Sequence, residues 1–267
     1  MVRRKNVIAV MSPKGGVGKT ITTANLAAAL ATEFDKKILT IDTNVSTSSL
    51  GLHFDIFYPK KTLHDITDKK TQKKSIHIYH RNLHIIPSCI KIKKRRDKDV
   101  LTMRRNIEKI TRQYDKMLSE FSKEYDLILL DCAPGYDLET IAAMRVAGGL
   151  LLVTNPEYPA IVTATRAIEY AKLMGVPLGG IVLNKVTKEK YELVKEDIEN
   201  ALKVKVIEQI PFDKKIPESI AKKVPVVLFK PRAKSSIAYK KLAASLVGET
   251  YPLGFFDRIG KFFRKSS

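Results

Sequence analysis

The chain has 267 residues, 44% of them hydrophobic, with two cysteines and a formal net charge of +20. This length allows one large domain or two small ones around a sizeable core. Cys89 and Cys132 lie too far apart for a zinc or iron–sulfur motif, so those sites are excluded, no disulfide framework is expected, and a reducing compartment is favoured. The positive charge favours an anionic partner, nucleic acid or acidic lipid, and a solvated lysine-rich surface explains it equally well.

Short apolar runs alternate with helix-like segments along the chain. The first run, residues 6–12, is too short for a secretory signal and leads into a glycine loop, so we interpret it as a strand. No run reaches the roughly 18 apolar residues that would span a bilayer. Further strands are predicted over residues 37–42, 83–88, 126–135, 148–156, 178–186 and 204–213, and helices over 20–31, 100–123, 137–147, 160–174, 188–202 and 234–246. Unbroken apolar strands separated by helices predict an α/β fold, a doubly wound, mostly parallel sheet with helices on both faces.

Residues 14–20 read KGGVGKT, between the first predicted strand and the first predicted helix. Glycines let backbone N–H groups turn toward phosphates, and the helix N-terminus adds the positive end of its dipole. In such a phosphate-binding loop Lys19 reaches the β- and γ-phosphates and the Thr20 hydroxyl ligates Mg²⁺. A second lysine, Lys14, precedes the glycines, although Lys19 already serves its own loop.

This loop resembles the deviant Walker A motif, and the chain resembles the MinD/ParA family of P-loop ATPases, in particular its archaeal MinD-like branch. Residues 37–52 resemble the switch I region, 125–135 the Walker B and switch II region, and 150–157, 181–186 and 210–213 the later strands of that family. The resemblance implies an ATP-hydrolysing switch with ATP and Mg²⁺ as cofactors. It implies that nucleotide is bound by Lys14, Gly15, Gly16, Val17, Gly18, Lys19, Thr20 and Ile21. In the family the extra lysine touches the partner's nucleotide, so Lys14 is expected to act across an ATP-dependent homodimer.

Two aspartates end predicted strands and match the family's Mg²⁺ site. Asp131 closes the strongest apolar run, and Asp42 closes the second strand. The resemblance therefore implies Thr20, Asp42 and Asp131 as metal-binding residues. The catalytic residues that it implies are Lys14, Lys19, Asp42, Asn44 and Asp131.

The sequence also indicates which nucleotide base, adenine or guanine, the site binds. Asn184 and Lys185 begin an Asn-Lys-x-Asp guanine motif, but Thr187 stands where its aspartate belongs, which favours adenine. By resemblance, Asn184, Pro211 and Asp213 occupy the adenine-facing positions.

The chain departs from the family pattern at two positions. Asn44 stands where the family has an aspartate that orients or activates the attacking water. An amide cannot take a proton, and such contributions are typically about 10²–10⁴-fold, so slow hydrolysis is expected. Ile21 stands where many relatives have a second threonine whose hydroxyl meets the α-phosphate.

The last residues form an amphipathic segment after a Gly/Pro break. At 100° per residue one face carries Phe255, Phe256, Ile259, Phe262 and Phe263, and the other carries basic residues. Such a helix suits an anionic membrane surface, and the MinD branch ends in a similar helix. We therefore expect a P-loop ATPase domain over 1–250, a membrane-targeting tail over 251–267, and a cytoplasmic protein at the inner face of the cell membrane.

The leading hypothesis is an ATP-switched, membrane-associated dimer that positions a cell-division site or cargo and answers to an activator protein. A second hypothesis is a ParA-like partition ATPase that binds DNA without sequence preference through the basic segments 69–74 and 91–96. A third is a slow or non-hydrolysing adaptor, suggested by Asn44.

Overall fold

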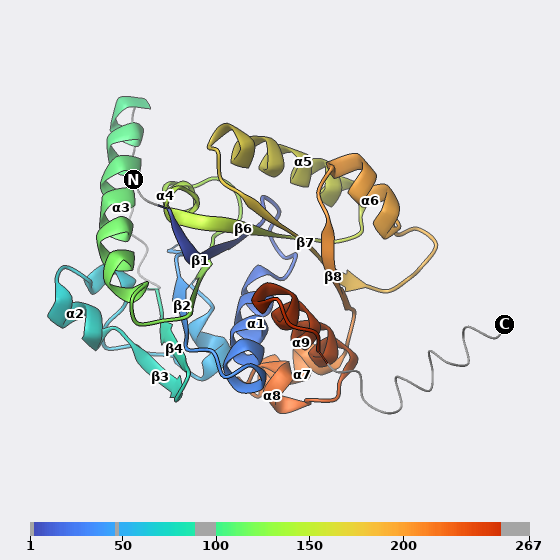
Figure 1. Cartoon of the computed structure of the whole chain (residues 1–267), viewed down its shortest axis with the longest axis horizontal. Helices are drawn as coiled ribbons and strands as arrows, with labels where there is room; N and C mark the ends of the chain where they lie inside the picture. Colours follow the sequence, from blue (N-terminus) through green and yellow to red (C-terminus); the bar gives the residue numbers. More distant parts are fainter. Residues whose placement is uncertain (1–2, 46–47, 89–99, 252–267) are drawn as a thin grey trace.

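The computed structural model describes residues 3–45, 48–88 and 100–251, whose strands join in one sheet (Figure 1). The strands are β1 (Arg4–Met11), β2 (Ile38–Asp42), β3 (His77–His80), β4 (Leu83–Ile86), β5 (Leu127–Asp131), β6 (Ala147–Thr154), β7 (Leu178–Val186) and β8 (Val206–Pro211). Their order across the sheet is β3-β4-β2-β5-β1-β6-β7-β8, and every pairing is parallel except that of β3 with β4. Chain order reverses on either side of β1, so the carboxyl ends of β1, β2 and β5 meet at a switch point where such sheets bind ligands.

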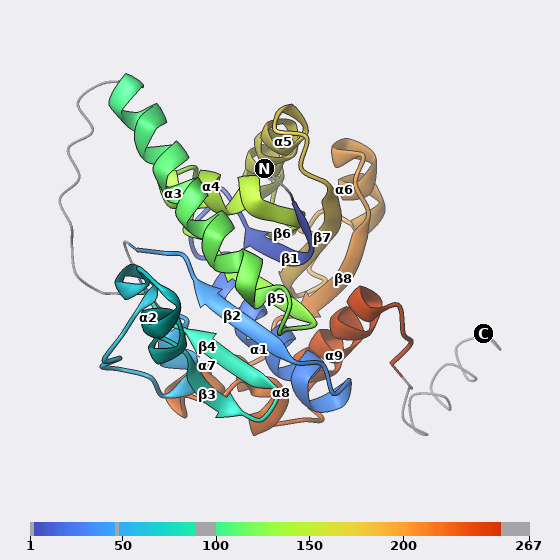
Figure 2. The same cartoon turned by 60° about the vertical axis from the view of Figure 1, so that its left-hand side comes forward.

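Helices cover both faces of this sheet, as predicted (Figures 1 and 2). One face is covered by α3 (Val100–Phe121), α4 (Leu138–Val146), α5 (Tyr158–Leu173) and α6 (Lys195–Leu202), which share one hydrophobic cluster with the strands. The other is covered by α1 (Lys19–Glu33), α7 (Lys215–Ala221), α8 (Val226–Phe229) and α9 (Lys234–Val247), which share a second cluster. Alanines make up much of the buried face of α1, and their small side chains bring this helix close to the sheet.

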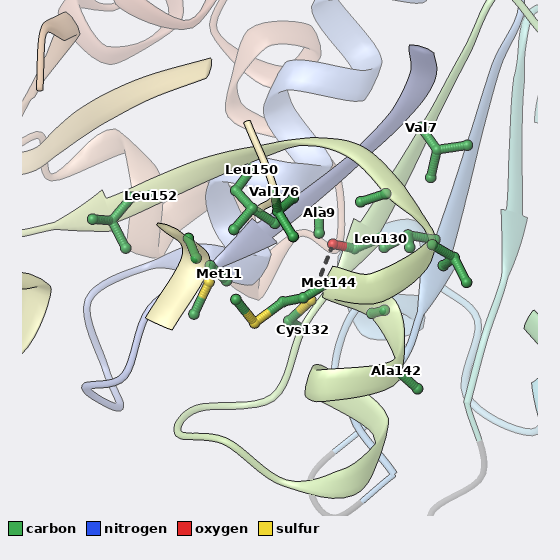
Figure 3. Close-up of a cluster of buried hydrophobic side chains, with 14 of the residues drawn as sticks. Val7, Ala9, Met11, Leu130, Cys132, Ala142, Met144, Leu150, Leu152 and Val176 are labelled. Carbon is green, nitrogen blue, oxygen red and sulfur yellow. Dashed lines mark hydrogen bonds between the residues drawn. The ribbon is translucent and has the colours of Figure 1, made fainter. Parts of the chain in front are cut away.

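The packing beneath α4 fixes the end of β5. Figure 3 shows Met144 of α4 close to Leu130 of β5, and both share one buried cluster with Ala142, Ala9 and Met11. Because close-packed side chains leave little freedom, the loop between β5 and α4 starts from a rigid base.

The predicted helix over 188–202 is wrong in its first part, because α6 begins only at Lys195. The carboxylate of Glu192 accepts hydrogen bonds from the backbone N–H groups of Thr187 and Lys188 and from the Thr187 hydroxyl, and Lys188 has a φ of +66°. A closed polar loop therefore replaces the first two helical turns.

Several short elements were not predicted, namely α2 (Lys69–Lys74), β3, α7, α8 and the 3₁₀ segments η1 (Gly51–Phe54) and η2 (Leu63–Asp65). The expected C-terminal helix, the basic segment 91–96 and Cys89 lie outside the described residues. Among the helices that are described, none combines the length and the apolar character needed to cross a membrane.

Candidate functional site

The loop between β1 and α1 has the backbone of a phosphate cradle. Gly16 and Gly18 have φ values of +74° and +100°, in the left-handed region that favours glycine. A Cβ atom on Gly18 would come within 2.1 Å of Nδ2 of Asn184, so this position has no room for a side chain. Gly18 also caps α1, whose first N–H groups therefore point toward the loop.

The two lysines of the loop lie in different surroundings. Lys19 is only 7% exposed, and its ammonium donates to the carbonyl oxygen of Lys14 at 3.3 Å. Burial lowers the pKa of Lys19, against the opposing attraction of Asp131. The Lys14 side chain is 38% exposed, and its Nζ lies 2.9 Å from Oε2 of Glu157, directly before α5. Lys19 is therefore aimed inside the site, and Lys14 at its rim.

Two buried carboxylates lie side by side at the carboxyl ends of β2 and β5. Asp42 and Asp131 are paired in register across the two strands. Burial raises the pKa of Asp42 to about 6, and burial together with the Asp42 charge raises that of Asp131 to about 7. Oδ2 of Asp131 has no hydrogen-bond partner among the described residues. Two buried negative charges repel each other, and a cation bound between them would stabilise both.

The donor set fits Mg²⁺, which prefers oxygen ligands and takes several of them from water and nucleotide phosphates. The Thr20 hydroxyl lowers the pKa of Asp131, Thr23 donates to its Oδ1 at 3.1 Å, and Asp42 is held by the loop that follows it. Within the described part of the chain, no three His, Cys, Asp or Glu side chains form a closed metal cage. Thr20, Asp42 and Asp131 would thus hold Mg²⁺ as partial ligands, and the ion would neutralise phosphate charge.

A cavity of about 290 Å³ opens in front of these groups. It is lined by Gly15, Gly16, Gly18, Lys19, Thr20, Ile21, Asn44, Ser49, His53, Cys132 and Pro134. Most of the predicted loop residues and Asn44 thus meet in one place. Asn44 is buried there, and its backbone N–H donates to Oδ1 of Asp42 at 2.9 Å.

The predicted base-facing residues separate into two groups. Nδ2 of Asn184 donates to the carbonyl oxygen of Val17 at 2.7 Å, which ties β7 to the phosphate loop. Asp213 accepts from the backbone N–H groups of Lys215 and Ser235 and from the Ser235 hydroxyl. Its carboxylate thus fixes the starts of α7 and α9. The cavity lining includes none of the three residues Asn184, Asp213 and Pro211, the last of which ends β8.

Sequence reasoning missed three residues at this site. Lys185 has a φ of +60° and donates from Nζ to the carbonyl oxygen of Gly16 at 2.8 Å, so it braces the loop. The Asn-Lys pair in the sequence could have indicated that this lysine lies near the nucleotide. Glu157 holds Lys14, and His53 lines the cavity, but their places in the sequence gave no signal of either contact.

Comparison with known proteins identifies the family of the chain. The family described as AAA domain, AAA_31, matches residues 5–175. An uncharacterized ATP-binding protein of Methanocaldococcus jannaschii is 32% identical over 262 residues, which cover 98% of this chain and 94% of that protein. The cell division ATPase MinD of Pyrococcus furiosus matches in structure with a TM-score of 0.79 at 28% identity, over 91% of this chain and 99% of that one.

The septum site-determining protein MinD of Pyrococcus horikoshii, solved with Mg-ADP, gives a TM-score of 0.77 at 28% identity and covers 92% of this chain and 96% of that one. These likenesses span the described sheet and its phosphate loop together. The chain belongs to the MinD/ParA family of P-loop ATPases, and its cofactors are ATP and Mg²⁺.

Proposed function

We propose that this chain is an ATP-dependent dimerising switch ATPase of the MinD type, which attaches to an anionic membrane surface and serves intracellular positioning. The observation that carries the proposal is that the two loop lysines lie at different places in the site. Lys19 is buried at the cavity, whereas Lys14 lies at the rim against Glu157. A cation at the rim is suited to reach the nucleotide of a second protomer.

The Lys14–Glu157 pair supports this switch. Both side chains are substantially exposed, and exposed ion pairs contribute only about 0–1 kcal/mol. Lys14 can therefore leave Glu157 for the higher charge of a triphosphate in the partner. After hydrolysis the charge that holds Lys14 falls, and the dimer dissociates.

Attachment to the membrane is assigned to the tail, residues 251–267, and nucleotide chemistry to residues 1–250. Five apolar side chains contribute roughly 1.5–3 kcal/mol each at full burial, and less at an interface. Ordering the helix costs about 1–2 kcal/mol per residue, so one tail is close to marginal. Two tails on one dimer raise avidity about 10²–10⁴-fold, which would bring the protein from the cytoplasm to the inner face of the membrane.

Replacement of Phe255 and Phe262 by aspartate tests the tail. We expect the double variant to stay off anionic liposomes in a co-sedimentation assay with a slowly hydrolysed ATP analogue, while it binds nucleotide like the parent. Exposed Phe57, changed to aspartate, is the matched control for an added charge in place of a phenylalanine. Full liposome binding by the double variant would contradict the assignment.

Hydrolysis is proposed to be slow because of Asn44, and we expect Asn44→Asp to raise turnover at least about tenfold by restoring a proton acceptor beside the attacking water. Phosphate release measures turnover, and fluorescent ADP binding checks that the site is intact. Unchanged turnover with intact binding would show that Asn44 does not limit the reaction, and absence of turnover in both proteins would favour a non-hydrolysing adaptor.

A second candidate function, DNA binding for partition, is favoured by the surface of α2. Its lysines Lys69, Lys70, Lys73 and Lys74 are all exposed. Gln72 anchors α2 to α3 through a 3.2 Å hydrogen bond to the carbonyl oxygen of Met117, and the two helices lie side by side in both views (Figures 1 and 2).

DNA added to the sedimentation assay separates the two functions. Phosphate contacts predict DNA binding that survives loss of the tail, weakens with salt, and disappears on Lys70→Glu with Lys73→Glu.

A further inference from the structure

His53 brings an imidazole to the nucleotide cavity from outside the phosphate loop. It belongs to η1, which follows the loop after β2. The cavity is lined by His53 and Ser49 together with the α1 residues Lys19, Thr20 and Ile21. Phosphates held by the loop therefore share this cavity with residues of both α1 and η1.

The backbone around His53 is firmly placed. The N–H groups of Ser49 and Leu50 both donate to Oδ2 of Asp42 at 3.2 Å, and the His53 N–H donates to the carbonyl oxygen of Leu50 at 3.1 Å. The next residue, Phe54, is buried and packs edge-on against Tyr79. The backbone that carries the ring is therefore in place before the ligand arrives.

One of the α1 residues that line the cavity has no polar side chain. Lys19 and Thr20 supply an ammonium and a hydroxyl, which in a phosphate loop serve the β- and γ-phosphates and Mg²⁺. Ile21, the next residue of the helix, also lines the cavity and offers only carbon. By resemblance to the family this position meets the α-phosphate, which here would find backbone N–H groups but no side-chain donor from Ile21.

Burial lowers the pKa of His53 to about 4, with no opposing contribution from a charged or hydrogen-bonding neighbour among the described residues. The ring is then neutral at neutral pH and carries one N–H donor. A half-buried donor with no acceptor among the described residues gains most from an anionic oxygen, because hydrogen bonds to charged groups are the stronger ones.

We infer that His53 is a phosphate-binding residue, whose ring N–H donates to the α- or β-phosphate of the bound nucleotide and takes the place of the side-chain donor that Ile21 cannot provide. The diphosphate and the triphosphate both carry these groups. His53 therefore contributes to binding of ADP and ATP alike, and it needs neither dimerisation nor membrane attachment.

The test is a double-mutant cycle read by calorimetric binding of Mg·ADP and of a slowly hydrolysed Mg·ATP analogue to the full chain. We expect His53→Leu, which keeps volume but removes the donor, to weaken both ligands about ten- to hundredfold. His53→Gln keeps a donor and should lose less. Ile21→Thr should rescue much of the loss in the His53→Leu background and add little to the parent. His80→Leu, at an exposed position of β3, is the matched control.

Three results would overturn the inference. Unchanged affinity for both ligands in His53→Leu would show that the ring makes no phosphate contact. Loss confined to the triphosphate would place the ring at the γ-phosphate instead. Strictly additive effects of Ile21→Thr and His53→Leu would mean that the two positions serve different groups. If the His53→Leu variant has a lower Tm than the parent without nucleotide, the affinities of the His53→Gln and Ile21→Thr variants decide the question instead.

Discussion

The Lys14→Ala variant is expected to bind nucleotide with nearly parental affinity and yet remain a monomer, whereas Lys19→Ala is expected to bind none. Lys19 lies buried at the cavity, where its charge faces phosphate in a poorly solvated setting. Lys14 lies at the rim and is held by Glu157. Light scattering after size exclusion, with a slowly hydrolysed Mg·ATP analogue, reports the dimer, and calorimetry reports nucleotide binding.

Glu157→Gln is the control for this pair of variants. It breaks the ion pair of Lys14 but leaves the lysine in place, so we expect the ATP-dependent dimer to persist. A Lys14→Ala protein that dimerises as the parent does would show that the lysine makes no essential contact across the interface.

The second large effect is expected from Asp131→Asn, which should stabilise the nucleotide-free protein and weaken its response to Mg²⁺. The change removes one of two buried like charges, and the Asn oxygen can still accept from Thr23. A gain on the order of 2 kcal/mol corresponds to a rise of about 4–8 °C in Tm for a chain of this size. Mg·ADP should then raise the Tm less than in the parent, because an amide binds the cation more weakly.

The pH dependence of the parent follows from the same two groups. Both folded-state pKa values are raised, to about 6 and about 7, so the folded form holds protons more tightly than the unfolded chain. This contribution to stability is complete below the unfolded pKa of about 4 and is lost as the pH rises through about 6 to 7. Asp131→Asn should therefore flatten the fall in Tm between about pH 5 and pH 8 without nucleotide.

Glu124→Gln is the matched control, because it removes an exposed carboxylate shortly before the same strand. It should leave the Tm and its pH dependence unchanged. An Asp131→Asn protein that melts lower than the parent at neutral pH would contradict the account of an uncompensated carboxylate pair.

The sheet was predictable because its central strands are continuous apolar runs, whose burial on both faces leaves few alternatives. The antiparallel edge strand β3 was not predicted, since it buries only one face of its sequence His77-Ile78-Tyr79-His80. The start of α6 was predicted too early because charged residues suit a helix as well as a loop. Only the local hydrogen bonds of Glu192 decide between them.

The site shows the same division. Gly18, Lys19 and Thr20 are contiguous, so their spacing alone predicts a phosphate loop. Glu157, Lys185 and His53 come from segments far along the chain, and only the fold brings them to the loop. The oxygens of Asp213 hold α7 and α9, a contact that sequence alone did not predict, and its adenine-facing role stays a prediction.

The central claim is that nucleotide state controls attachment to the membrane, and flotation of the full chain with anionic liposomes tests it most directly. The protein should float with liposomes in a slowly hydrolysed Mg·ATP analogue and stay in the dense fraction in Mg·ADP, at equal protein concentration and ionic strength. Equal flotation in both nucleotides would contradict the switch and leave the net charge of +20 as the cause of lipid binding.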